Sequence, residues 1–263
     1  MNKLSRVSLA LLAAALATNV ALAKEDNKLN GSMEVTTAHA SLSAPYPDAK
    51  ISSVSALFNL KDDNKLGLSV TSLDAWGEQA NYFNVRHLHH LSEDRWLDIN
   101  AGFSDKGKIT AEHRVNAMFN QKFPDISTIL GVGVDYYTMR SGGSGKSVRA
   151  QVVKYVPGVP LVLQGGVALS TSSMNDRSGH QISVAATYGR VGDWTITGTA
   201  STGRVHYELV THPGSVADFN SRSTGVGGRY WVGQNWGVSV NLGKVSNRYY
   251  TREEIRAGIF VSF

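Results

Sequence analysis

The sequence predicts an all-β fold, namely an antiparallel transmembrane β-barrel of about fourteen strands. Three observations lead to this prediction. A short apolar leader follows a basic start, which indicates export. No later apolar run approaches the roughly 18 residues that a membrane helix needs. The rest of the chain consists of segments of about 10–13 residues in which apolar and polar residues alternate between turn signals, and this pattern is typical of tilted membrane strands.

The first 23 residues have the features of a secretory signal peptide. Lys3 and Arg6 form a basic start, residues 7–17 are apolar, and Ala21-Leu22-Ala23 is a small-x-small cleavage pattern. We therefore expect cleavage after Ala23, with the barrel domain spanning residues 24–263. A barrel exported in this way belongs in the outer membrane of a Gram-negative cell.

Composition excludes several classes of function. The chain has no cysteine, so thiol nucleophiles, disulfides and cysteine-ligated metals are excluded. The formal charge of +5 falls to +3 once Lys3 and Arg6 are removed with the leader. That charge is too small to indicate nucleic-acid binding. Twenty-six glycines and few charges suit strands whose residues alternate between two surfaces.

Alternation and turn signals together define fourteen strands, with twelve or sixteen as the alternatives. The predicted strands span residues 31–42, 50–60, 65–75, 80–90, 95–104, 109–120, 126–138, 147–156, 160–171, 180–190, 193–206, 222–232, 235–245 and 254–263. An even number of strands closes an antiparallel sheet without a free edge.

The predicted connections alternate between tight turns and longer loops, of which 207–221 is the longest. Six turns and seven loops place both termini on the turn side, which is periplasmic in bacterial outer-membrane barrels. The six prolines fall in connections or at a strand's first position, where no ladder hydrogen bond is lost. The five tryptophans lie at or within two residues of strand ends, as expected for interfacial aromatic girdles.

The last predicted strand carries a distinctive signal. Every second residue back from Phe263 to Ile255 is apolar, the other row is mostly polar or small, and Phe260 is the exception. An apolar stripe that ends in a C-terminal aromatic is similar to the assembly signal of outer-membrane proteins. We therefore expect the barrel-assembly machinery to recognise Phe263.

The same alternation sends charged residues toward the lumen. A basic residue facing lipid near the midplane would cost about 2–4 kcal/mol, so inward orientation is required whatever the function. These residues either pair with one another and fill or brace the lumen, or line a mildly cationic aqueous conduit. The candidate lumen-lining residues are Arg86, Asp98, Glu112, Arg114, Asp135, Arg149, Arg229, Glu254 and Arg256.

Two motifs are better explained by a structural role than by a catalytic or metal-binding one. Residues 141–147 are similar to a phosphate-binding loop, but Arg140 stands where glycine is needed and a strand follows instead of a helix. His87 and His89 share one strand face that His90 opposes, which favours interfacial aromatics over a metal site. Neither a nucleophile elbow nor a cofactor motif is present. We therefore predict no enzymatic activity, cofactor or metal.

The final strands, 238–245 and 257–263, resemble those of the YaiO-type outer-membrane β-barrel family, as does the layout of a signal peptide, short hairpins and no soluble domain. Membership implies an association with exopolysaccharide or envelope biogenesis and supplies no catalytic residues. Any periplasmic helper would be a separate protein, because the chain carries no tetratricopeptide repeats.

The sequence is consistent with two functions. One is a conduit or accessory protein for export of polysaccharide or other anionic or sugar-rich material. The other is a non-conducting structural or receptor barrel with a side-chain-filled lumen. In both cases we expect the barrel to be surrounded by outer-membrane lipid and lipopolysaccharide. The export function would add a periplasmic or polysaccharide partner. Neither function involves nucleic acid.

Overall fold

The computed structural model describes residues 30–43, 45–106, 110–140, 142–173, 178–208 and 216–263, without the side chains of 205–208 and 216–218. The predicted signal peptide and its cleavage site lie outside the described residues. Within them, no helix is long and apolar enough to cross a membrane.

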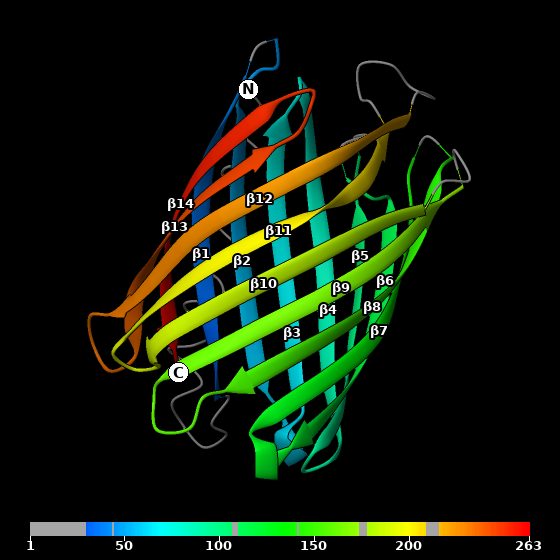
Figure 1. The fold of residues 1–263 in the computed structure, drawn as a ribbon. Helices are drawn as coiled ribbons and strands as arrows, with labels where there is room; N and C mark the ends of the chain where they lie inside the picture. The colour runs from blue at the N-terminus through cyan, green and yellow to red at the C-terminus, as the bar shows by residue number, and fades with distance from the viewer. Residues whose placement is uncertain (1–29, 44, 107–109, 141, 174–177, 209–215) are drawn as a thin grey trace.

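Fourteen antiparallel strands form one closed barrel, which confirms the predicted fold class (Figure 1). The first seven are β1 (Asn30–Leu42), β2 (Ala49–Asn59), β3 (Lys65–Ala75), β4 (Glu78–Ser92), β5 (Arg95–Ser104), β6 (His113–Phe123) and β7 (Thr128–Thr138). The other seven are β8 (Ser144–Tyr155), β9 (Leu161–Ser172), β10 (Ser178–Arg190), β11 (Trp194–Glu208), β12 (Val216–Trp231), β13 (Trp236–Ser246) and β14 (Thr251–Ser262). Two single-turn 3-10 helices, η1 (Lys61–Asp63) and η2 (Pro124–Ile126), lie in turns.

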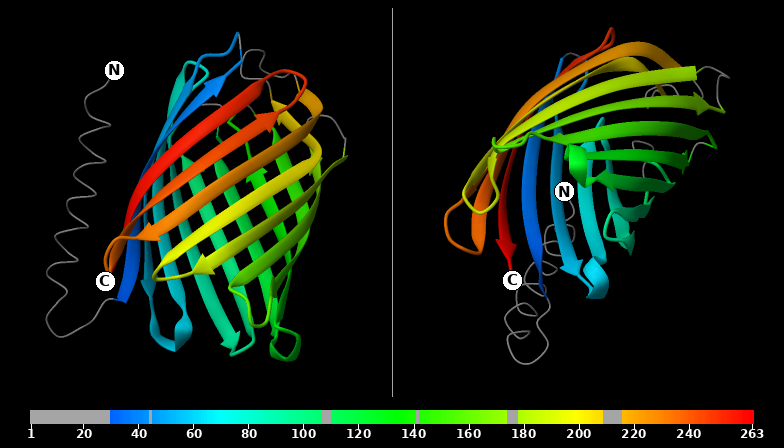
Figure 2. Two further views of the ribbon diagram at one scale, coloured as in Figure 1. Left: turned by 60° about the vertical axis from the view of Figure 1, so that its left-hand side comes forward. Right: turned by 60° about the horizontal axis from the view of Figure 1, so that its bottom comes forward.

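Each strand pairs with its neighbours in sequence, and β1 pairs with β14 to close the sheet. At this closure Val35 lies opposite Ile259, and the backbones of Gly31 and Phe263 exchange hydrogen bonds of 2.8 and 3.0 Å. The strands tilt across the barrel in all views (Figure 2). The start of β1 and the end of β14 lie at the same end as η1, so both ends of the barrel sheet lie on the short-turn side.

Side chains alternate along the strands as a membrane barrel requires. Many outward side chains are apolar and uncovered by protein, as at Leu169, Val184 and Ile259, which are 65%, 56% and 62% exposed. Burial of such side chains therefore depends on lipid. The five tryptophans lie in the first two or the last position of a strand, or in the turn directly after one.

Several predicted strand boundaries and connections differ from the structure. Trp76 and Gly77 form a two-residue turn in which both residues have positive φ, although a longer loop over 76–79 was predicted. The predicted loop 207–221 shrinks because β11 continues to Glu208 and β12 begins at Val216. The predicted strand 109–120 is displaced to 113–123.

A small apolar cluster lies inside the barrel at the long-loop end of β1, β2 and β3. Its buried members are Ala40, Leu42, Ala49 and Ala75, against which Tyr46, Leu73, Trp76 and Tyr250 pack. The rings of Tyr46 and Tyr250 meet edge to face, with centroids 5.8 Å apart. The loops after β1 and before β14 are therefore anchored to one side of the mouth.

Candidate functional site: the polar lumen

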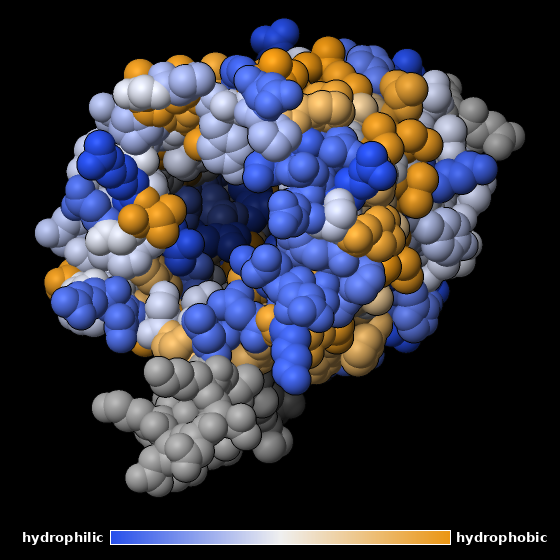
Figure 3. All heavy atoms as spheres, turned by 90° about the horizontal axis from the view of Figure 1, so that it is seen from below, coloured by the Kyte–Doolittle hydropathy of each residue, from blue (hydrophilic) through white to orange (hydrophobic). Residues whose placement is uncertain are grey.

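The barrel is hollow when viewed from the short-turn end, and the visible wall of the hollow is hydrophilic (Figure 3). A cavity of about 720 Å³ lies along the inner wall of β6 to β10 and reaches the long-loop ends of the strands. Drug-sized ligands occupy pockets of about 300–1,000 Å³, so this cavity can hold a solute of several rings.

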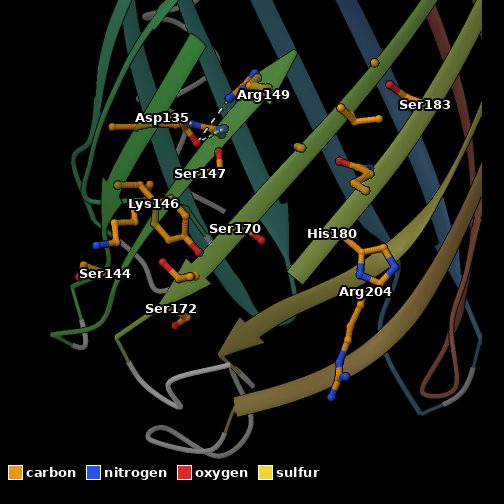
Figure 4. Close-up of a pocket in the computed structure, with 18 of the residues that line it drawn as sticks. Asp135, Ser144, Lys146, Ser147, Arg149, Ser170, Ser172, His180, Ser183 and Arg204 are labelled. Carbon is orange, nitrogen blue, oxygen red and sulfur yellow. Dashed lines mark hydrogen bonds and ion pairs between the residues drawn. The ribbon is translucent and has the colours of Figure 1, made fainter. Parts of the chain in front are cut away.

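Asp135 on β7 is the charged centre of this wall. Its side chain is only 5% exposed, and Arg114 on β6 donates to both of its carboxylate oxygens, at 2.8 and 3.0 Å. Arg149 on β8 reaches the same carboxylate at 3.5 Å (Figure 4). Two guanidinium groups thus share one carboxylate, which leaves this triad with a formal charge of +1.

The cavity changes character along the strands. Near the long-loop ends, its rim includes Lys146, His180 and Arg204, which extend away from the Asp135 triad in Figure 4. Strand alternation places these three in the outward rows, so they border the opening of the cavity and do not line its deeper wall. Asp135 is the only acid among the described residues that line the cavity.

Uncharged hydrogen-bonding groups cover the rest of the wall. Inward side chains on β9 and β10 are small or carry hydroxyl or amide groups, such as Ser170, Gln181 and Ser183. Several pair across strands, with 3.3 Å from Gln181 Nε2 to Ser201 Oγ and 2.9 Å between the hydroxyls of Thr187 and Thr197. These uncharged groups can therefore form hydrogen bonds with a hydrated solute, and no ion pair has to be broken for this.

The family of YaiO membrane beta barrel domains matches residues 30–208, about two thirds of the chain. The chain belongs to this family. The YaiO-type barrel is thus an outer-membrane β-barrel, as the resemblance of its final strands predicted. No curated protein is significantly similar to it.

Solved structures similar to this YaiO-type barrel are outer-membrane barrels of very different sequence. A structure described as a bacterial polysaccharide outer membrane secretin is 11% identical, with a TM-score of 0.60 over 90% of this chain and 100% of that one. Omp33 of Acinetobacter baumannii is 10% identical, with a TM-score of 0.52 over 89% and 99%. An anion-selective porin from Comamonas acidovorans is 9% identical, with a TM-score of 0.50 over 90% and 99%. At such identities the likeness shows the fold alone.

The predicted lumen residues of the YaiO-type barrel fall into separate ion-pair groups. Arg114, Asp135 and Arg149 meet at the cavity, whereas Arg86 and Asp98 form a bidentate pair of their own, at 2.8 and 2.6 Å. The other four lie apart from the cavity triad. Arg229 pairs with Glu34 at 3.2 Å, Glu112 with Arg140 at 3.3 Å, and Arg256 with Glu254 at 2.9 Å.

Glu34, Arg140 and Arg252 are not among the predicted lumen residues. Glu34 pairs with Arg229 and Arg140 with Glu112, and Arg252 forms a second ion pair with Glu254. Sequence reasoning also did not select Tyr82 and Tyr137, whose rings border the cavity. The inward parity of β14 could have identified Arg252, because it shares a row with Glu254 and Arg256. Among the described residues, seven arginines share five carboxylates in these pairs, so the interior retains an excess of positive charge.

The histidines of β4 lie on two faces. The rings of His87 and His89 stack with centroids 5.7 Å apart, while His90 stacks on Trp96 at the same separation. No group of three or more His, Asp or Glu side chains in the described ranges could hold a metal ion.

Proposed function

We propose that this barrel is a hydrated conduit through which anionic or sugar-rich material crosses the outer membrane. The observation that carries the proposal is the polar cavity in which Arg114 and Arg149 share the single carboxylate of Asp135. Fixed positive charge along an aqueous path raises the local concentration of anions and favours their passage. Hydroxyl and amide groups on the remaining wall suit solutes that carry many hydroxyls.

The similar solved structures are consistent with this proposal at the level of fold. One is described as an anion-selective porin and another as a polysaccharide outer membrane secretin. Because a fold hosts many functions, the proposal depends on the lumen chemistry and not on these likenesses.

The test is single-channel conductance of the refolded, heat-modifiable barrel in a planar bilayer, with reversal potentials measured in a KCl gradient. We expect steady currents that prefer anions. Replacing Arg114, Arg149 and Arg229 together by glutamine should weaken this preference. As a control, Lys50→Gln and Lys244→Gln remove positive charge from outward rows and should leave the preference unchanged.

Two results would contradict the conduit. Unchanged selectivity in the triple variant would exclude an arginine-lined pathway. A barrel that carries no current would favour the second candidate, a structural or receptor barrel. The pairing of every predicted lumen arginine with a carboxylate supports this second candidate, because ion pairs can also brace a closed lumen.

A further inference from the structure

The cavity beside Asp135 holds one arginine whose hydrogen-bonding capacity is largely unused by the described protein. Arg114 takes both oxygens of Asp135, so Arg149 is left with a single longer contact of 3.5 Å. The Arg149 side chain is 34% exposed and lines the cavity. A guanidinium presents five N–H donors in a planar fork that matches a carboxylate. Arg149 can therefore bind an external carboxylate without giving up its contact with Asp135.

The groups around Arg149 fit a polyhydroxylated ligand better than a simple ion. Ser147 lies two residues before it on the same face, and Gln151 two residues after it. Ser170 on β9 and Gln181 on β10 continue this polar wall across the cavity. A small inorganic anion would contact only the charged groups, whereas a sugar ring spans the distance between them and the hydroxyl and amide groups.

Two tyrosine rings complete the enclosure. Tyr82 on β4 and Tyr137 on β7 both line the cavity near Arg114. Each lies over an inward glycine, because a Cβ at Gly102 would come within 2.2 Å of the Tyr82 hydroxyl and one at Gly145 within 2.4 Å of the Tyr137 ring. Glycine at these two positions leaves the space that the rings occupy. A tyrosine offers an apolar face together with a polar tip, which suits a sugar with C–H and O–H faces.

We propose that this cavity is a binding subsite for a sugar residue that carries a carboxylate, with Arg149 holding the carboxylate and the hydroxyl and amide wall holding the sugar hydroxyls. The inference rests on the proposed conduit function and names the chemical class of its cargo. Lys146 and Arg204 at the rim place further positive charge where an acidic saccharide would enter or leave.

The test is isothermal titration of the refolded barrel in detergent with trigalacturonate, an acidic trisaccharide. Maltotriose serves as the neutral ligand of equal length, and acetate and inorganic phosphate serve as anions without a sugar. We expect saturable binding of trigalacturonate, at least about tenfold tighter than binding of any of the other three. Loss of one charge-assisted hydrogen-bonding group should weaken this binding about tenfold or more in Arg149→Gln.

Two further variants make the result specific. Arg149→Lys keeps the charge but loses the planar fork. Its affinity for trigalacturonate should therefore lie between those of the original protein and Arg149→Gln. Lys50→Gln removes the same charge from the outer surface and should leave binding unchanged. Heat-modifiable migration in electrophoresis establishes that each variant has refolded.

The outcomes separate this inference from the conduit proposal. Equal binding of maltotriose and trigalacturonate, or of phosphate and trigalacturonate, would overturn the acidic-sugar subsite. Selective binding by a barrel that conducts no current would support the subsite and overturn the conduit. Anion-preferring current without selective binding would support the conduit and overturn the subsite.

Discussion

Arg229 on β12 and Glu34 on β1 form an ion pair at 3.2 Å, although 195 residues separate them in the chain. The pair reaches past β13 and β14, which lie between these strands in the sheet. Ser239 on β13 donates to the same glutamate at 2.8 Å, and the Arg229 guanidinium lies 4.2 Å from the ring centroid of Phe260 on β14. Four strands are thus linked inside the barrel at the point where the two ends of the sheet meet.

Replacing Arg229 should destabilise the barrel more than replacing Glu34. Glu34→Gln removes the ion pair but keeps the contact between Arg229 and Phe260. Because both charged side chains are partly exposed to the lumen, we expect this change to cost about 1 kcal/mol. Arg229→Gln removes the cation–π contact as well, and should cost about 2 kcal/mol. Urea unfolding of barrels refolded into vesicles measures both.

The outward pair of Lys244 and Glu253, at 2.8 Å, provides the control for this prediction. Both side chains are more than half exposed, so Lys244→Gln should leave the unfolding midpoint unchanged. Equal unfolding midpoints for Arg229→Gln and Lys244→Gln would mean that the contacts of Arg229 with Glu34 and Phe260 do not stabilise the closure of the barrel.

The same cluster explains the one irregularity in the predicted last strand. Alternation assigns Phe260 to the inward row, where an apolar residue looks out of place. The structure places it at 3% exposure beneath Arg229 and edge to face with Trp231, with ring centroids 5.0 Å apart. The alternation of β14 thus predicts the orientation of Phe260, but its partners come from β12 and follow only from the closed register.

Strand number and order could be predicted because lipid imposes a strict period of two on membrane-facing rows. Strand ends could not, because that constraint disappears beyond the membrane. β12 begins at Val216 and runs through the mostly polar residues 217–223, which were predicted as mostly loop. Cross-strand backbone hydrogen bonds do not depend on side-chain polarity, so a hairpin can extend into water. At β6, the polar residues Gln121 and Lys122 likewise belong to the strand and not to the turn.

The candidate site was predictable in part. The alternation of side chains predicts that Arg114, Asp135 and Arg149 all face the lumen, because the other face of each of their strands is apolar. Glu34 was missed because Thr36 and Thr37 put the same residue type on both faces of its strand and His39 follows among alanines, so alternation there gives no clear parity. Which carboxylate two arginines share depends on register between strands, and the sequence of one strand does not contain that information.

Two glycines on the inward face of β13 should respond very differently to alanine. A Cβ at Gly237 would lie 2.2 Å from the carbonyl oxygen of Tyr230 and 2.4 Å from the Phe260 ring. No heavy atom lies within 4 Å of the corresponding position at Gly243. We expect Gly237→Ala to cost about 1–3 kcal/mol through overpacking. Gly243→Ala should change stability by no more than about 0.5 kcal/mol.

Both glycine variants are compared in the same urea unfolding measurement. Because the two positions share a strand and a face, differences in strand propensity largely cancel. A Gly243→Ala variant as unstable as Gly237→Ala would show that the close contacts at Gly237 do not determine the cost.

Adjacent residues on β10 provide a test of which face meets lipid. Val184 is 56% exposed in the outward row, and Ser183 lines the inner cavity. Val184→Arg places a cation against lipid near the middle of the strand, so it should destabilise the barrel by about 2–4 kcal/mol. Ser183→Arg enters a hydrated lumen and should change stability by less than about 1 kcal/mol. Unfolding midpoints in vesicles of one lipid composition give the comparison.

The reverse ranking of these two variants would contradict the assigned faces. Ser183→Arg has a second expected effect that Val184→Arg lacks. It adds positive charge to the cavity wall, so the anion preference of the conductance should increase.

Asp135→Asn should separate the structural and the electrostatic roles of the shared carboxylate. It neutralises the only acid among the described cavity-lining residues, so we expect a stronger anion preference in the reversal potential and tighter binding of an acidic sugar. It also weakens two charge-assisted contacts to Arg114 and one ion pair to Arg149, at a cost of about 1–3 kcal/mol.

Asp98→Asn is the matched control, because this change weakens the bidentate pair with Arg86 at a position outside the cavity. It should lower the unfolding midpoint without changing sugar binding. A loss of anion preference in Asp135→Asn would mean that Asp135 acts mainly by holding the two arginines in position, because their displacement would then outweigh the added positive charge.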